Sequence, residues 1–85
     1  MRLELLNFYF ERNGFKRNAN KKYFNYIREP YEVKIFKLER KAFIIKENAI
    51  VYETGLPTKE ASIVKWCNIL IDKDENKNNQ IDSED

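Results

Sequence analysis

The chain has 85 residues, of which 42% are hydrophobic and 35% are charged, and its formal net charge is +2 at pH 7. It contains no histidine, one cysteine and two glycines. This composition excludes most enzymatic designs, because proton transfer near neutral pH usually relies on imidazole and phosphate-binding loops need several glycines close together.

The charge is unevenly distributed along the chain. Residues 1–72 carry 14 basic and 9 acidic side chains, a net charge of +5, whereas residues 73–85 carry 2 basic and 5 acidic ones, a net charge of −3. We expect a single folded domain over residues 1–72 and a flexible, acidic polar tail over residues 73–85. A basic body with an acidic tail is typical of proteins that meet anionic partners.

The composition also indicates the cellular compartment in which the protein acts. No stretch approaches the ~20 apolar residues that span a bilayer. The single Cys67 cannot form an internal disulfide, as is usual in a reducing compartment. We therefore expect a cytoplasmic protein. The abundance of lysine, asparagine and isoleucine indicates an AT-rich genome, such as that of a low-GC bacterium or its phage.

The first expected element is a helix over Leu3–Asn13. Apolar residues recur there at helical spacing, Leu6 and Phe10 among them. Gly14 predicts a left-handed residue that ends the helix, and Phe15 can then fold back on the last turn.

Strand segments follow the helix. We expect them at Phe15–Arg17 and Lys21–Ile27, on either side of Asn18-Ala19-Asn20, where asparagine favours a tight turn. Glu29-Pro30 breaks the chain. Tyr31–Lys37 then alternates apolar and polar residues with the period of two that is typical of a strand.

A hairpin is the next prediction. Its strands are Lys41–Lys46 and Ala49–Thr54, and Glu47-Asn48 joins them. A two-residue loop would place Ile45 opposite Ile50, Phe43 opposite Tyr52, and Ile44 opposite Val51.

A second helix completes the expected fold. We expect Thr58 to cap it, Glu60 to complement the helix dipole, and the helix to end near Ile71. Its expected core stripe consists of Ile63, Trp66, Cys67 and Leu70. The predicted class is α+β, with a four-stranded, mainly antiparallel sheet and the N-terminal and C-terminal helices packed on one face.

Two basic groups with interleaved aromatic rings are the candidate binding surface. The first consists of Arg12, Lys16, Arg17, Lys21, Lys22, Tyr23, Tyr26 and Arg28. The second consists of Lys34, Phe36, Lys37, Arg40 and Lys41. Cations neutralise phosphates and rings stack on unpaired bases, so this mixture suits single-stranded nucleic acid. The alternative is that the cations only solvate exposed hairpins and the rings fill the core.

Strand alternation leaves open which rings face outward. If Phe24 and Tyr26 fill the core, then Tyr23 points away from it, or the reverse holds. With both helices on one face, the other face of the sheet would be uncovered. We expect that uncovered face to bind another macromolecule.

The polar tail suggests a metal site. Its candidate ligands are Asp74, Asn76, Asn78, Gln80, Asp82 and Asp85. Their spacing over Asp74–Asp85 resembles a twelve-residue EF-hand calcium loop, with Ile81 at the hydrophobic position. The resemblance implies calcium binding by the tail. The other interpretation, which we favour, is a solvated polar tail with no metal.

These observations predict a binding protein and not an enzyme, since no pair of carboxylates is spaced as a catalytic acid and base. We expect a small accessory or inhibitor of phage or mobile-element origin, of the anti-defence type. It would act by protein contact on a larger protein or nucleoprotein complex that handles nucleic acid, without a cofactor. The alternative is direct binding of single-stranded DNA or RNA. A homodimer could form through a sheet edge, and no membrane partner is expected.

Overall fold

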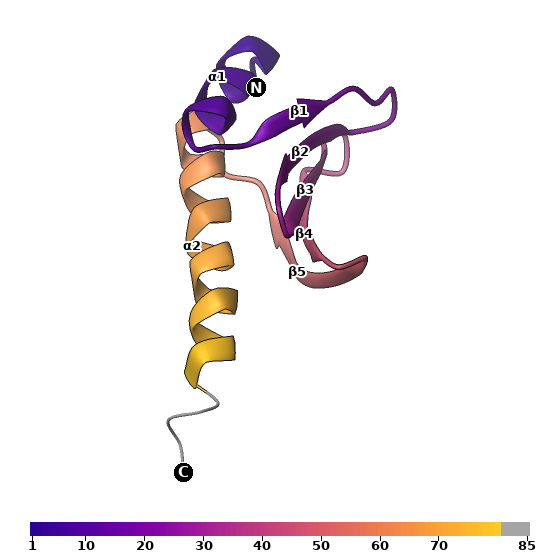
Figure 1. Cartoon of the computed structure of the whole chain (residues 1–85). Coiled ribbons are helices and arrows are strands. Elements are labelled where there is room, and N and C mark those ends of the chain that lie inside the picture. Colours follow the sequence, from indigo (N-terminus) through magenta and orange to yellow (C-terminus); the bar gives the residue numbers. More distant parts are fainter. Residues whose placement is uncertain (81–85) are drawn as a thin grey trace.

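The computed structural model describes the backbone of residues 1–80 and the side chains of residues 1–77. The elements are α1 (Leu3–Arg12), β1 (Lys16–Asn18), β2 (Phe24–Arg28), β3 (Tyr31–Phe36), β4 (Lys41–Lys46), β5 (Ala49–Gly55) and α2 (Glu60–Gln80). The strands form one sheet in the order β1-β2-β3-β4-β5, and each is antiparallel to the next (Figure 1). The predicted α+β class, with an antiparallel sheet between two helices in sequence, is confirmed.

The number of strands corrects the prediction of a four-stranded sheet. The fifth strand is β1, whose register on β2 runs from Lys16 opposite Ile27 to Asn18 opposite Asn25. The strand segment expected at Phe15–Arg17 is therefore confirmed, shifted by one residue, and only the count of four strands in the sheet is wrong. All three β1 side chains are exposed. The pairing of β1 depends on the connection to β2, where the Asn20 side chain accepts the backbone N–H of Lys22 at 2.8 Å.

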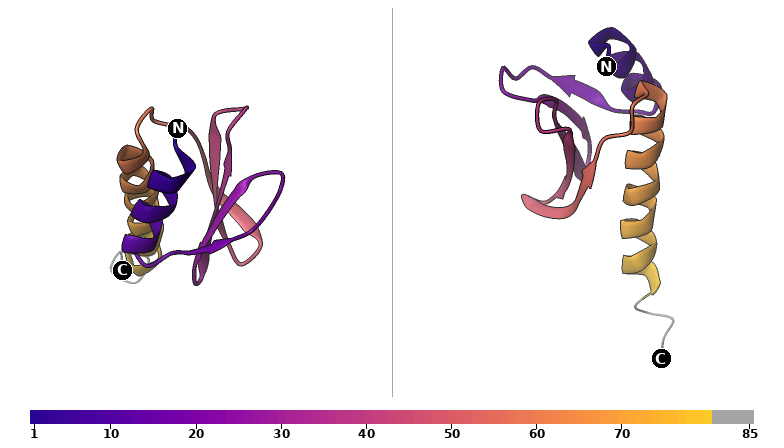
Figure 2. Two further views of the ribbon diagram at one scale, coloured as in Figure 1. Left: turned by 90° about the horizontal axis from the view of Figure 1, so that it is seen from above. Right: turned by 180° about the vertical axis from the view of Figure 1, so that it is seen from behind.

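Both helices cover the same face of the sheet, as the view from above shows (Figure 2). The core lies between the helices and the sheet, and both helices and the sheet contribute side chains to it. Phe10 of α1 stacks on Tyr26 of β2, with 4.0 Å between the ring centroids. Ile44 of β4 and Ile63 of α2 are likewise buried. The Tyr26 hydroxyl donates to the Asn7 side chain, and burial raises the pKa of Tyr26 to about 12.

The end of α1 has the predicted geometry. Gly14 has a φ of +86°, and its N–H donates to the Glu11 carbonyl at 3.1 Å. The Phe15 N–H donates to the Phe10 carbonyl at 3.1 Å, and their rings meet edge to face at 5.1 Å. This Schellman arrangement satisfies two helix-end carbonyls and turns the chain into β1.

The β4–β5 hairpin confirms the predicted two-residue loop, because Glu47 and Asn48 both have positive φ, at 52° and 67°. The pairing of Ile45 with Ile50 is confirmed as well. Beyond it the predicted register is wrong, because a bulge after Ile44 shifts the strands.

The shifted register places Ile44 opposite Tyr52 and Phe43 opposite Glu53, not Ile44 opposite Val51 and Phe43 opposite Tyr52. Ile44 and Tyr52 then both turn toward the helices, where Ile44 is fully buried.

The second helix differs from the prediction at both ends. Ile63 N–H donates to the Lys59 carbonyl at 3.0 Å, so Lys59, and not Thr58, occupies the cap position. The helix continues past Ile71 to Gln80. The predicted core stripe is wrong at Trp66, which is 39% exposed, whereas Ile63, Cys67 and Leu70 are buried as predicted.

The extended part of α2 contacts the sheet through Asp74. The hydroxyl of Tyr31, on β3, donates to Asp74 Oδ2 at 2.6 Å, and Lys46 Nζ lies 3.7 Å from the same oxygen. Burial and this hydrogen bond both raise the pKa of Tyr31. The contact ties the beginning of the segment predicted as a tail to the sheet.

Candidate binding surface

The outer face of the sheet, the one turned away from α1 and α2, carries the candidate site. On β3, Val33 and Ile35 point into the core, so Lys34 and Phe36 point outward. The register of β3 on β4 places Phe43 opposite Lys34. The sheet curls, and the β1–β2 connection and the β4–β5 hairpin both reach away from α2 (Figure 1). The outer face is therefore concave and has no helix over it among the described residues.

Three aromatic rings meet on this face. The ring centroids of Tyr23 and Phe36 lie 5.2 Å apart with an interplanar angle of 38°. Phe36 meets Phe43 edge to face at 5.5 Å. All three side chains are half-buried although no other element of residues 1–80 covers them. Lys34 Nζ lies 5.0 Å from the centroid of Tyr23, a cation–π contact.

Two connections bring cations to these rings. Because the strands run antiparallel in sequence order, residues 19–23 and 37–40 lie at the same end of the sheet. The first connection carries Lys21 and Lys22, and the second carries Lys37 and Arg40, all exposed. We call this region the basic aromatic end: Lys21, Lys22, Tyr23, Lys34, Phe36, Lys37, Arg40, Lys41 and Phe43.

Hydrogen bonds hold both connections in shape. Asn20 Oδ1 also accepts the N–H of Tyr23 at 3.3 Å, in the turn that brings the Tyr23 ring back over the sheet. Arg40 has a φ of 54°, and its carbonyl accepts the N–H of Leu56 at 3.1 Å. The cationic turn between β3 and β4 is thus tied to the segment that follows β5.

The basic aromatic end is positive overall. Its six cations face two carboxylates, Glu39 and Glu53, which leaves a net charge of +4. Glu53 pairs with Lys41 at 2.9 Å, but both side chains are about half exposed, so the pair is weak and can be displaced. The other cations there make no ion pair among the described residues.

The structure separates several predicted site residues from this end. Tyr26 has no exposed surface and belongs to the core, so its prediction as a surface residue is wrong. Arg28 lies 4.4 Å from the Phe15 ring and donates to the Asn13 carbonyl, so it supports the end of α1. Arg12 lies over the ring of Phe8, 5.5 Å away.

The two β1 cations also lie apart from the basic aromatic end. Arg17 is opposite Tyr26, whose side chain points into the core, so Arg17 is on the helix side at the sheet edge. Lys16 is opposite Ile27, at the other end of the outer face. The eight remaining predicted residues do come together, and Phe43 is the ring that the sequence analysis missed. Its position depends on the β3–β4 register, which only the turn at residues 37–40 fixes.

Asn25 lies on the outer face between its two ends and is only 2% exposed. Its amide nitrogen donates to Glu32 Oε2 at 2.7 Å and to the Val33 carbonyl at 3.3 Å. Its amide oxygen accepts from Asn18 Nδ2 at 3.1 Å. These bonds satisfy a buried amide and link three strands beneath the concave face.

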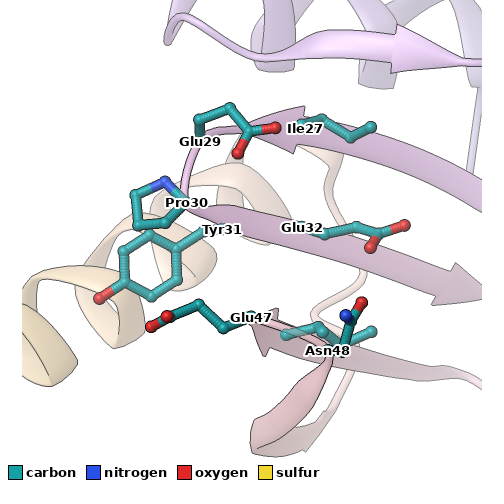
Figure 3. A pocket seen from close by; sticks show the side chains of 8 residues that line it. Ile27, Glu29, Pro30, Tyr31, Glu32, Glu47 and Asn48 are labelled. Atoms are coloured by element: carbon teal, nitrogen blue, oxygen red, sulfur yellow. The ribbon is translucent and has the colours of Figure 1, made fainter.

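The opposite end of the outer face is acidic. A shallow pocket of about 200 Å³ lies between the β2–β3 and β4–β5 turns, and its lining includes Glu29, Glu32 and Glu47 together with Ile27 and Ile45 (Figure 3). We call this the acidic end. The sequence analysis did not identify it, although each glutamate lies in or beside a predicted turn.

The calcium candidates fall into two groups. Four of them, Asp74, Asn76, Asn78 and Gln80, lie within α2, where positions two residues apart are separated by about 200° round the axis. The Asp74 carboxylate is held by Tyr31 and Lys46. Asp82 and Asp85 lie outside the described residues. Within the part that is described, no three acidic, cysteine or histidine side chains gather as metal ligands.

Cys67 is a core residue of α2, with 1% of its surface exposed. Burial raises the pKa of its thiol to about 12, so the reactive thiolate is scarce at neutral pH. This agrees with the predicted role of Cys67 as an ordinary buried side chain.

Comparison with protein-family models, curated proteins and solved structures finds no match to this chain. Neither helix within residues 1–80 has the length and apolar character needed to cross a membrane. The function is therefore argued from the geometry of the outer face.

Proposed function

We propose that this protein is a small, non-enzymatic binding protein that takes single-stranded DNA or RNA at the basic aromatic end of its outer face. One observation carries the proposal: Tyr23, Phe36 and Phe43 adjoin one another on a sheet face that no described element covers, with Lys34 against Tyr23 and five more cations at the same end of the sheet. Cations neutralise phosphates and release counterions, while each ring that stacks on a base contributes about 1–3 kcal/mol.

The same geometry favours a single strand over a duplex. Bases must be unpaired and turned outward before they can reach aromatic rings on a protein surface. Duplex reading in the major groove usually requires a helix or a two-stranded ribbon that enters the groove. Within the described residues, no helix lies on the outer face that could enter a groove (Figure 1).

The absence of an enzymatic role is part of the proposal. The chain has no histidine, and its one thiol is buried in the core with a raised pKa. A lone reduced cysteine also supports the proposed place of action in the cytoplasm.

Leu38 favours a second candidate function. It lies in the β3–β4 turn between Lys37 and Arg40 and is 92% exposed. This exposed aliphatic side chain, with the cations of the same turn beside it, could serve as an apolar contact for a protein. In this candidate, the chain is a phage or mobile-element accessory that inhibits a nucleic-acid-handling complex by contacting its protein surface.

Oligonucleotide titration by fluorescence anisotropy, at about 50 mM and about 200 mM salt, tests the first function. The double variant Lys21→Ala/Lys22→Ala should reduce the slope of log K against log salt by about 1.4, the single-strand value for two phosphate contacts. The matched control Lys59→Ala/Lys65→Ala removes two exposed cations from the helix side and should leave the slope unchanged.

Ring stacking is tested separately with Phe36→Leu, which keeps an apolar side chain of similar bulk. Binding should weaken about 5- to 150-fold, the equivalent of about 1–3 kcal/mol. Phe8→Leu, at a ring that is 48% exposed on α1, is the control.

If no oligonucleotide binds even at low salt, the nucleic-acid function is wrong. The protein-contact candidate is then tested by pull-down from the host with wild type and Leu38→Ser. A partner retained by the wild type and lost with the variant would support it, and equal retention by both would contradict it.

A further inference from the structure

We infer that the bound strand crosses β2, β3 and β4 at the basic aromatic end, and that the site accepts a short unpaired segment of about three nucleotides instead of tracking a long strand. This inference rests on the proposed nucleic-acid function and specifies its ligand. The ligand class is a loop, a gap or a strand end.

The row formed by the three aromatic rings sets the direction in which the bound nucleic-acid strand crosses the sheet. Tyr23 precedes β2, Phe36 ends β3 and Phe43 lies on β4, so the row runs across the strands and not along them. The centroid separations of 5.2 and 5.5 Å are close to the strand spacing of about 4.8 Å. The row is thus about 10 Å long, and bases along one strand are about 3.4 Å apart when stacked. Such a row has room for about three bases.

The acidic end limits the footprint. Phe36 and Tyr31 mark the two ends of β3, five residues apart, which corresponds to about 17 Å. A strand that followed β3 would bring its phosphates over Glu32 and close to Glu29, whose carboxylates point the same way in Figure 3. Glu47 lines the same pocket from the β4–β5 turn. Lys16 is the cation of β1 at this end. Arg28 and Lys46 end their strands here too, but their charged groups lie on the helix side, over the rings of Phe15 and Tyr31. On the outer face the acidic end therefore keeps a net negative charge.

The repulsion of phosphates acts at a fixed position on the outer face, because the Glu32 carboxylate is held in place. Glu32 Oε2 is held by Asn25 Nδ2 at 2.7 Å, so the Glu32 carboxylate cannot swing away from the face. Glu32 is four residues from Phe36 on β3, about 13 Å, which exceeds the Debye length of about 10 Å at 0.1 M salt. It is two residues from Lys34, about 7 Å. Its repulsion is therefore screened at Phe36 and grows for phosphates that extend past Lys34 toward the acidic end.

A length series of oligothymidylates, from about 3 to about 12 nucleotides, tests the inference. The affinity of the wild type should rise with oligonucleotide length only because a longer oligonucleotide offers more equivalent positions at which the site can bind. The triple variant Glu29→Gln/Glu32→Gln/Glu47→Gln should bind the longest oligonucleotide roughly fivefold more tightly than wild type, the product of three weak surface-charge effects. It should bind the shortest with unchanged affinity.

The control is Glu4→Gln/Glu11→Gln/Glu75→Gln, which removes three exposed carboxylates from the helices and changes the net charge equally. Glutamine at position 32 keeps an oxygen that can accept from Asn25. If the triple variant melts early, the single exposed changes Glu29→Gln and Glu47→Gln replace it, with proportionally smaller gains.

The outcomes are distinguishable. Absence of binding at every length overturns the proposed function itself. Binding that strengthens steeply to the longest oligonucleotide, or that responds equally to both triple variants, overturns the short crossing footprint while the nucleic-acid function stands.

Discussion

Substitution of Asp74 tests how α2 is joined to the sheet. Its carboxylate accepts the Tyr31 hydroxyl at 2.6 Å and lies 3.7 Å from Lys46 Nζ. Tyr31 is 2% exposed, so Asp74→Ala leaves a buried hydroxyl without its acceptor. A hydrogen bond to a charged group contributes about 1.5–3 kcal/mol, and the ion pair adds little at that distance.

We therefore expect Asp74→Ala to lower the free energy of unfolding by about 2 kcal/mol. A domain of this size has a total stability of about 4–13 kcal/mol, and a loss of 2 kcal/mol corresponds to a fall in Tm of about 10 °C. Urea denaturation followed by circular dichroism at 222 nm measures the loss.

The control is Asp72→Ala, an exposed aspartate in the same helix, which should change stability by less than about 0.5 kcal/mol. A double-mutant cycle with Tyr31→Phe isolates the contact. If Asp74→Ala costs no more than Asp72→Ala, or if the coupling with Tyr31→Phe is negligible, the contact between Asp74 and Tyr31 does not stabilise the joint between α2 and the sheet.

Three further predictions concern the body of the fold. Gly14→Ala should lower the free energy of unfolding, measured by urea denaturation, by about 1–2 kcal/mol, because φ is +86° at this position. The control Gly55→Ala should be nearly neutral, since its new Cβ would have no atom closer than 4.0 Å. Equal losses in the two variants would contradict the requirement for a left-handed residue at position 14. The buried Cys67 thiol should react with a disulfide reagent only as fast as the protein unfolds locally or globally, so urea should accelerate the labelling. Rapid labelling of the native protein would contradict the burial of this thiol. Above pH 10 the unfolded chain releases the Tyr26 proton, while the native state holds it up to about pH 12, so the free energy of unfolding should fall by about 2–3 kcal/mol between these two pH values. Tyr26→Phe should remove that part of the decline. If the variant shows the same decline, other groups cause it.

Local signals in the sequence were sufficient for much of the fold. Gly14 and Phe15 predicted the end of α1 because a left-handed residue and a returning ring act within one helical turn. The alternation of Tyr31–Phe36 predicted β3, and Glu47-Asn48 predicted a two-residue hairpin loop. Each of these features is decided by residues that are neighbours along the chain.

Alternation could not say which set of side chains in β2 faces the helices. The structure buries Tyr26 against Phe10 and turns Tyr23 outward, and that choice depends on the shape of a helix surface elsewhere in the chain. The bulge after Ile44 is similar, because it brings Ile44 and Tyr52 to the same face only in the presence of the core.

The binding surface itself was decided in the same way. Composition identified cations and rings along one half of the sequence, but the antiparallel order of the strands gathered eight of them at one end of the sheet and left the others elsewhere. The same order collected three glutamates at the opposite end. The sequence by itself determined which elements form and that the chain carries a basic, aromatic population. Only the tertiary structure decided which of those side chains meet, because contacts between separate strands depend on register and burial and not on spacing along the chain.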